Sequence, residues 1–360
     1  MAQDTTRLRE FKLLAVLSRR IEYVDTFTGT GRTDTLRKEC LTTGGQDGVI
    51  AMYHLDRLEN VNKRFFSAHL GNICSLRTRR PTETGAASFI SCSWDYTTSV
   101  WAIPPFRDDP DFLEDLAPRP VLSLPHEAAV WDALSIELEA FPDQIVTACA
   151  DSLVRLWQGN RCKFTYKGHE GPVRCLAKVM PEDDDCELFA SASNDGTVRI
   201  WDLRGNAITA LSGHDSFIYA MAAPPACLIT TGEGGIVRIW AAADGDLQQE
   251  LLVPATSGKS RDPTTCSLLA NSMDAVWTVV CIPNGDIAVG SSDGQIWIFT
   301  RCSERQANEE DQELYETSLL KFQAQRPSVL LRAHKKTIFI SLADLKNSSY
   351  RSRGLQSMMR

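Results

Sequence analysis

Short apolar runs separated by tight turn signals recur along the chain, and the clearest example is LFASASNDGTVRIWDLRG, residues 188 to 205. Here Asn194-Asp195-Gly196 separates two apolar runs, and the second run ends at Trp201-Asp202. Asn and Gly tolerate the positive φ of a tight hairpin turn, whereas Leu, Phe, Val, Ile and Trp suit a pleated, largely buried surface. The pattern therefore predicts a β-hairpin, and its significance depends on how often it recurs.

Several residue types repeat in register with this hairpin. The aromatic residues that end each hairpin are Tyr53, Trp101, Trp157, Trp201, Trp240 and Phe299. Six positions earlier stand Asp47, Asp95, Asp151, Asp195, Gly234 and Asp293, and ten positions earlier stand Thr43, Ser91, Thr147, Ser191, Thr230 and Val289. Histidines precede four of the hairpins, at His69, His126, His169 and His214. A repeat of roughly 40 to 60 residues is typical of a propeller blade, so the sequence predicts an all-β propeller with six recognisable four-stranded blades.

These columns resemble the WD40 repeat, most plainly in GHEGPVRCLAKV followed by LFASASNDGTVRIWDL. In that family the His, Ser or Thr, Asp and Trp of a blade form a hydrogen-bonded tetrad. Carried over to this chain, the complete tetrads are His69-Ser91-Asp95-Trp101, His126-Thr147-Asp151-Trp157 and His169-Ser191-Asp195-Trp201. A Ser-His-Asp set could also be a catalytic triad, but a catalytic site occurs once and this set occurs three times. The resemblance therefore implies structural tetrads and no catalytic residues.

A finer resemblance is carried by FISCSWDYTTSVW, AAVWDAL, GHDSFIYAMA and above all AVWTVVCIPNGDIAVGSSDGQIWIFTR, residues 275 to 301. Over about residues 10 to 301 the chain resembles the propeller of the phospholipase A-2-activating protein family. The resemblance implies a ubiquitin-binding adaptor that works with the AAA unfoldase valosin-containing protein. Family members have a seven-bladed propeller followed by two further domains. We recognise neither domain here, so the unfoldase partnership rests on analogy alone, and one blade is expected to be missing between roughly residues 18 and 25.

The predicted organisation is a propeller over residues 1–301 and a charged tail over residues 302–360, disordered or partly helical. After Phe299 the sequence TRCSERQANEEDQ is too polar for an outer strand, whereas LREFKLLAVL, Leu8 to Leu17, has strand character. We therefore expect the N-terminal strand to complete the last blade and remove its exposed edge. The segments from Pro104 to Pro120 and from Pro254 to Ser272 are predicted loops.

Composition narrows the function without naming it. The 360 residues carry a formal net charge of -8, which argues against nucleic acid as a partner. No apolar run reaches the roughly 18 residues of a membrane span, so we expect a cytoplasmic and nuclear location without membrane association. The 11 cysteines are scattered and form no CxxC, which favours reduced thiols over a metal or redox site. No phosphate-binding loop or metal motif is present in the sequence, so no cofactor is predicted.

The candidate binding residues lie where the first strand of each blade begins, nearest the propeller axis. This position is occupied by Cys74, Trp131, Arg174, Tyr219 and Trp277, and Trp94 faces the same rim from beside a turn aspartate. Large aromatic side chains and arginine are enriched in protein-binding hot spots. These side chains could instead merely fill the channel. The favoured hypothesis is a ubiquitin-binding adaptor in ubiquitin-dependent protein turnover. The alternatives are a general WD-repeat scaffold for another complex, and an enzyme, for which no unrepeated nucleophile is evident.

Overall fold

The structure is a computed structural model that describes most of the predicted propeller. It describes residues 21–29, 38–54, 63–79, 88–102, 119–136, 144–179, 188–242, 244–254, 275–282, 285–292, 296–301, 307, 309, 312–313, 315–317, 319–320 and 338–340. The predicted closing strand Leu8–Leu17 and the turn residue Asp293 lie outside this set, as does nearly all of the two predicted loops.

The described strands form six four-stranded sheets, in which neighbouring strands are antiparallel and follow chain order. The first three sheets consist of β1 (Ile21–Gly29), β2 (Lys38–Gly45), β3 (Val49–His54) and β4 (Lys63–Ser67); β5 (Ile73–Arg79), β6 (Ser88–Ser93), β7 (Thr97–Ala102) and β8 (Leu122–Pro125); and β9 (Val130–Ile136), β10 (Gln144–Cys149), β11 (Val154–Gln158) and β12 (Arg161–Tyr166). The last three consist of β13 (Val173–Val179), β14 (Leu188–Ser193), β15 (Thr197–Asp202) and β16 (Ala207–Ser212); β17 (Ile218–Ala222), β18 (Cys227–Gly232), β19 (Ile236–Ala241) and β20 (Leu247–Leu252); and β21 (Val276–Cys281), β22 (Ile287–Ser291), β23 (Ile296–Thr300) and β24 (Ile338–Ile340). The six predicted blades and their all-β class are confirmed.

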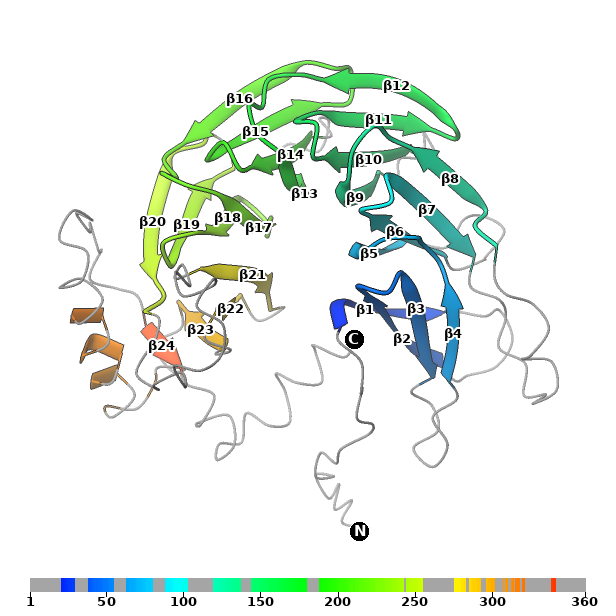
Figure 1. Cartoon of the computed structure of the whole chain (residues 1–360). Helices are drawn as coiled ribbons and strands as arrows, with labels where there is room; N and C mark the ends of the chain where they lie inside the picture. Colours follow the sequence, from blue (N-terminus) through cyan, green and yellow to red (C-terminus); the bar gives the residue numbers. More distant parts are fainter. Residues whose placement is uncertain are drawn as a thin grey trace, which may run out of the picture.

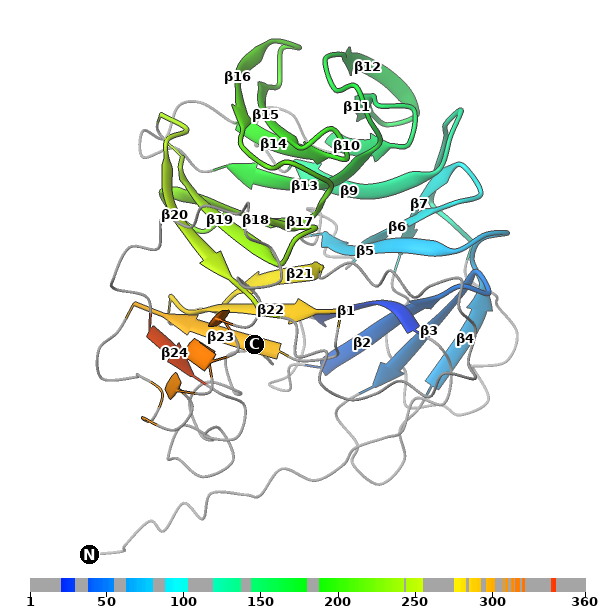
Figure 2. The same cartoon turned by 60° about the vertical axis from the view of Figure 1, so that its left-hand side comes forward.

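The sheets stand side by side around a central space, and their inner strands β1, β5, β9, β13, β17 and β21 face it (Figure 1, Figure 2). An apolar cluster fills each of the five junctions between consecutive sheets. Trp201 illustrates the packing: it is almost fully buried between the third and fourth sheets. Truncation of such an indole to alanine costs about 3–5 kcal/mol in folded proteins, so these junctions hold the propeller together.

The outer strand of the sixth sheet differs from the prediction. β24 pairs with β23 through Ile298 and Ile340, Phe299 and Phe339, and Thr300 and Ile338, at the edge that we expected Leu8–Leu17 to occupy. Closure by the N-terminal strand is therefore not confirmed. The reason is local: β24 has the sequence IFI, and β-branched and aromatic residues favour a strand even within a basic segment.

The first and sixth sheets, at the two ends of the series, stand further apart in Figure 1 than any two sheets that follow one another along the chain. Val280 and Ile296, on the face of the sixth sheet that points away from the fifth, are half exposed. Their counterparts in the fourth sheet, Ala177 and Val198, are buried by the fifth sheet. The sixth sheet therefore presents an incompletely covered face where a further blade would pack. Residues 21–25, where we placed the missing blade, belong to β1.

Candidate functional site

The fourth sheet contains a complete hydrogen-bonded tetrad. The Trp201 indole donates to Ser191 Oγ at 2.8 Å, and the Ser191 hydroxyl lies 2.8 Å from His169 Nε2. The other ring nitrogen of His169 donates to Asp195 Oδ2 at 2.8 Å. Asp195 also accepts the Thr197 hydroxyl at 2.7 Å, so a fifth residue belongs to the network. The tetrad joins the turn that precedes the inner strand to the second and third strands of the sheet.

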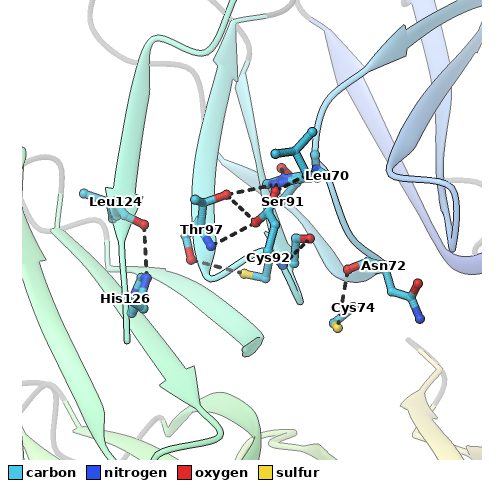
Figure 3. Close-up of polar contacts among 12 residues, drawn as sticks. Leu70, Asn72, Cys74, Ser91, Cys92, Thr97, Leu124 and His126 are labelled. Carbon is cyan, nitrogen blue, oxygen red and sulfur yellow. Dashed lines mark hydrogen bonds and ion pairs between the residues drawn. The ribbon is translucent and has the colours of Figure 1, made fainter. Parts of the chain in front are cut away.

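The second sheet repeats this arrangement. Trp101 donates to Ser91 Oγ at 2.8 Å, Ser91 lies 2.6 Å from His69 Nε2, and His69 Nδ1 lies 3.0 Å from Asp95 Oδ2. Thr97 again donates its hydroxyl to the aspartate, at 2.6 Å (Figure 3). Burial alone would raise the pKa of Asp95, but hydrogen bonds from His69 and Thr97 outweigh it and hold that pKa well below its ordinary value.

The third sheet has the same four residue types but a different network. Trp157 donates to Thr147 Oγ1 at 3.0 Å, and Thr147 lies 2.9 Å from His126 Nε2. However, His126 Nδ1 donates to the carbonyl of Leu124 at 3.0 Å (Figure 3) rather than to Asp151. The predicted tetrad therefore lacks its link from histidine to aspartate.

Asp151 of the third sheet is held by a different partner. Its Oδ2 accepts Arg155 Nη2 at 2.6 Å, and its Oδ1 accepts the backbone N–H of Leu153 at 3.1 Å. Leu153 occupies the position of Thr97 and Thr197 in the complete tetrads, so no hydroxyl is available to join aspartate to histidine. Burial alone would raise the pKa of Asp151, but the hydrogen bonds from Arg155 and from the Leu153 N–H, together with the positive charge of Arg155, outweigh it and lower that pKa.

The fifth sheet has a triad that the sequence analysis did not include among the tetrads. Trp240 donates to Thr230 Oγ1 at 2.9 Å, and Thr230 lies 2.7 Å from His214 Nε2. Gly234 stands in place of the aspartate. Both Gly234 and Gly235 have positive φ, 83° and 70°, so this turn has a different backbone path from the aspartate turns.

The two histidines that lack a hydrogen bond to an aspartate, His126 and His214, have pKa values far below the ordinary value for histidine. Desolvation, assisted by Arg155, lowers the pKa of His126 to about 4, and desolvation with Arg238 lowers that of His214 to about 3. Burial also lowers the pKa of His169, but the hydrogen bond to Asp195 opposes the shift. A turn aspartate therefore compensates the buried imidazole for the loss of water.

The predicted rim residues lie in contact with one another across five successive sheets. Trp94 and Trp131 meet edge to face with ring centroids 5.5 Å apart. The Arg174 guanidinium lies 3.9 Å from the Trp131 ring centroid and 5.8 Å from that of Tyr219. Tyr219 stacks on Trp277 at 4.4 Å. We call Trp94, Trp131, Arg174, Tyr219 and Trp277 the aromatic rim.

Arg174 is positioned as well as stacked. Its Nε donates to Asn194 Oδ1 at 2.9 Å, which holds the guanidinium plane over Trp131. Burial lowers the pKa of Arg174. Cys74, at the equivalent position of the second sheet, is partly exposed and directs its thiol to the carbonyl of Asn72 (Figure 3). Together these contacts create a surface on which the half-exposed Trp94 and Trp277 flank a restrained cation.

A buried carboxylate beneath the rim fixes the inner strands. Asp132 is 3% exposed. It accepts hydrogen bonds from Ser75 at 2.7 Å, from Arg77 Nη2 at 2.7 Å and from the backbone of Leu176 at 3.0 Å. These partners lie on β5 and β13, and Asp132 itself follows Trp131 on β9. The signal for this cluster, an aspartate inside the apolar strand VWDALSI, was visible in the sequence but was not used.

Within the described residues, other kinds of site find little support. No group of three His, Cys, Asp or Glu side chains is arranged to hold a metal ion, and no described helix is long and apolar enough to span a membrane. Ser91 and Ser191 are fully buried, which leaves a substrate no access to their hydroxyls. The described cysteines are free thiols, and burial raises the pKa of Cys149 and Cys281 to about 11, which disfavours the reactive thiolate.

Three exposed apolar residues near the rim were missed by the sequence analysis: Leu70, Tyr96 and Phe217. Phe217 meets Tyr219 edge to face at 6.4 Å. Leu70 and Tyr96 lie on the two turns of the second sheet. Comparison of these two turns with their counterparts in the other repeats would have identified Leu70 and Tyr96, because acidic residues stand at the positions equivalent to Leu70 in the next three sheets and glycine at most of those equivalent to Tyr96.

The fold and the repeated His–Ser/Thr–Trp networks define a WD40 β-propeller, a repeat architecture that binds partners on the faces of its ring. The WD domain, G-beta repeat model matches residues 160–202, which include β12 to β15. The crystal structure of the WD40 beta propeller domain of Doa1 is similar with a TM-score of 0.56 and 30% identity, covering 75% of this chain and 77% of that chain.

Two curated relatives point the same way. The Ubiquitin fusion degradation protein 3 homolog of Caenorhabditis elegans is 27% identical, over 75% of this chain and 28% of that protein. The Ubiquitin homeostasis protein lub1 of Schizosaccharomyces pombe is 27% identical, over 49% of this chain and 26% of that protein. The chain belongs to the phospholipase A-2-activating protein family of WD40 propellers. It spans about a quarter of the length of these two curated relatives.

Proposed function

We propose that this propeller is a non-catalytic ubiquitin-binding adaptor and that the aromatic rim is its binding surface. The observation that carries the proposal is the continuous contact from Trp94 through Arg174 to Trp277. The names of the two curated relatives associate those proteins with ubiquitin pathways. The partnership with valosin-containing protein and the cytoplasmic and nuclear location stay predictions.

The chemistry of the rim suits a protein partner with an apolar patch, such as the one ubiquitin presents. Trp94 and Trp277 are about half exposed, so each has a large apolar area available for a partner. Aromatic side chains lose little conformational entropy on binding, and Arg174 is already held by Asn194 and Trp131. A rim ordered in this way gives up less entropy on binding than a flexible surface.

The surrounding turns favour a partner with basic groups beside its apolar patch. Glu127, Glu170 and Asp215, each of which follows a repeat histidine, are exposed. Opposite charges at the edge of an interface act mainly on orientation and association rate. Because the rim offers a partner only one surface, we expect weak binding, with a Kd of about 10–1,000 μM, which corresponds to about 4–7 kcal/mol.

The test is a titration of labelled mono-ubiquitin with the purified chain. Trp131→Ala and Trp277→Ala are each expected to weaken binding by more than about 1 kcal/mol, because a rim side chain contributes more to a partner's contact than to the core. Ile208→Ala is the control, since Ile208 is a similarly exposed apolar residue on the outer strand β16. Its affinity should equal that of the parent chain.

Two results would count against the proposal. Absence of ubiquitin binding to a folded chain would favour a scaffold for another protein. Binding that survives both tryptophan substitutions in folded variants would show that ubiquitin uses a different surface. Circular dichroism and the thermal midpoint of each variant would establish that it is folded.

A further inference from the structure

The second sheet has an unusual residue at a position with restricted backbone geometry. In the five described hairpin turns, the residue after the aspartate position has positive φ: Gly48 71°, Tyr96 71°, Ser152 68°, Gly196 77° and Gly235 70°. This left-handed region is disfavoured for residues with a bulky side chain, and glycine adopts it freely. Tyr96 is the one large residue among the five.

The ring of Tyr96 receives little compensation from its own chain. It is 52% exposed, and within the described part of the protein only its backbone carbonyl forms a hydrogen bond, with the N–H of His126 at 2.8 Å. A disfavoured backbone conformation that carries an exposed aromatic ring is more typical of a functional position than of a structural one.

Tyr96 lies in an apolar surface patch formed by two adjoining turns. Trp94 is 48% exposed and Leu70 is 100% exposed. The turns are joined by a hydrogen bond from Leu70 N to Asp95 Oδ2 at 2.9 Å and by another from Trp94 N to Asn72 O at 2.9 Å. We call Leu70, Trp94 and Tyr96 the second-sheet patch.

The other described sheets do not repeat this patch. The counterparts of Leu70 in the next three sheets are Glu127, Glu170 and Asp215. The counterparts of Trp94 are Gln46, Ala150, Asn194 and Glu233, and those of Tyr96 are glycine or serine. Three large apolar residues at these positions are therefore a feature of the second sheet among the described turns, and Trp94 joins them to the aromatic rim through Trp131.

We propose that the second-sheet patch is the specificity-determining extension of the aromatic rim, and that it extends the footprint of bound ubiquitin from the rim over the turns of the second sheet. This inference rests on the proposed function. Its occupant is the same apolar patch of ubiquitin that contacts the rim. Continuity between Trp94 and Trp131 supports a single footprint, and the acidic turns of the next three sheets restrict an apolar contact to this side.

The experiment compares Tyr96→Gly with Ser152→Gly in the titration of labelled mono-ubiquitin. Both variants place glycine at a positive-φ position, so each should leave the thermal midpoint unchanged or raise it. Tyr96→Gly is expected to weaken ubiquitin binding about five-fold or more, whereas Ser152→Gly keeps the parent affinity. Leu70→Ala is expected to weaken binding about three-fold, and Tyr96→Phe to retain it, because the contact is apolar.

The outcomes separate this inference from the proposed function. If ubiquitin binds, Trp131→Ala weakens it, and Tyr96→Gly and Leu70→Ala bind like the parent chain, the second-sheet patch is overturned and the rim stands. If the parent chain does not bind ubiquitin, both proposals fail. A fall in the thermal midpoint for Tyr96→Gly but not Ser152→Gly would show that the ring supports the fold, and would overturn the functional assignment of Tyr96.

Discussion

The third and fourth sheets carry the same His, Ser or Thr, Asp and Trp columns, yet only the fourth completes its tetrad. In the fourth sheet Asp195 lies 2.8 Å from the histidine ring, whereas in the third sheet Asp151 bonds Arg155 at 2.6 Å. An arginine also follows the turn in the fourth sheet, at Arg199, so arginine alone does not divert the aspartate.

The residue two positions after the aspartate separates the two cases. Thr197 donates its hydroxyl to Asp195 at 2.7 Å, and the same oxygen lies 3.2 Å from the His169 ring. Thr97 has the same role in the second sheet. Leu153 has no hydroxyl. The comparison indicates that the tetrad works as a pentad, in which threonine fixes the carboxylate toward the histidine.

The largest expected effect is the loss of the turn aspartate in the complete network. Asp195→Ala should lower the free energy of unfolding by about 2–4 kcal/mol, because it leaves the buried His169 and the N–H of Glu170 without their acceptor. Asp151→Ala should cost less, since it strands no histidine and the long side chain of the partly buried Arg155 can turn its charge toward water. Urea unfolding followed by tryptophan fluorescence measures both, and equal losses would contradict the comparison.

The second effect concerns pH and the two histidines without an aspartate. The pKa values of His126 and His214 are about 4 and about 3 in the folded protein, against about 6.5 in an unfolded chain. Between these values the unfolded state binds more protons than the folded state, so the free energy of unfolding rises with pH. The contribution of each neutral histidine is fully present above about pH 6.5 and is lost as the pH falls toward the folded-state pKa. Each histidine should lower the free energy of unfolding by about 2 kcal/mol at pH 5 relative to pH 7.5.

Glutamine substitutions test this assignment. Gln keeps a hydrogen-bonding amide near Thr147 or Thr230 but does not titrate, so His126→Gln and His214→Gln should each reduce the difference in stability between pH 7.5 and pH 5. Urea unfolding at the two pH values is the measurement. A difference that persists in the double variant would assign the acid sensitivity to other groups.

The sequence predicted much of this architecture because the tetrad residues recur at a fixed spacing. The spacing of six and ten residues between aspartate, hydroxyl residue and tryptophan is set by a two-stranded hairpin, so the six sheets and the order of the columns follow from local pattern. The rim residues were found by the same register. Trp131, Arg174, Tyr219 and Trp277 occupy equivalent positions on successive inner strands, and the structure brings them into one chain of contacts.

What the sequence did not predict depends on choices between competing partners. Asp151 had two candidate partners, and the choice of Arg155 over His126 depends on the side chain at position 153. The outer strand β24 is separated from β23 by a long segment, and its three residues are too short for a periodic signal. Tyr96 does not resemble a turn residue, so its positive φ is evident only from its alignment with the glycines of other turns.

The smallest expected effect on stability would provide the sharpest test of the pentad. The double variant Leu153→Thr and Arg155→Ser copies Thr97 and Ser99 of the second sheet into the third. Asp151 should then turn to His126 Nδ1 and raise the pKa of His126 above its value of about 4. The change in stability should be less than about 1 kcal/mol, because one charge-assisted hydrogen bond replaces another.

Removal of Arg155 alone also raises the pKa of His126 by taking away a positive charge, so Arg155→Ser is the control. Histidine titration by NMR should give a larger rise for the double variant than for the control. Equal rises would show that threonine does not direct the aspartate, and the tetrad would then need no fifth member.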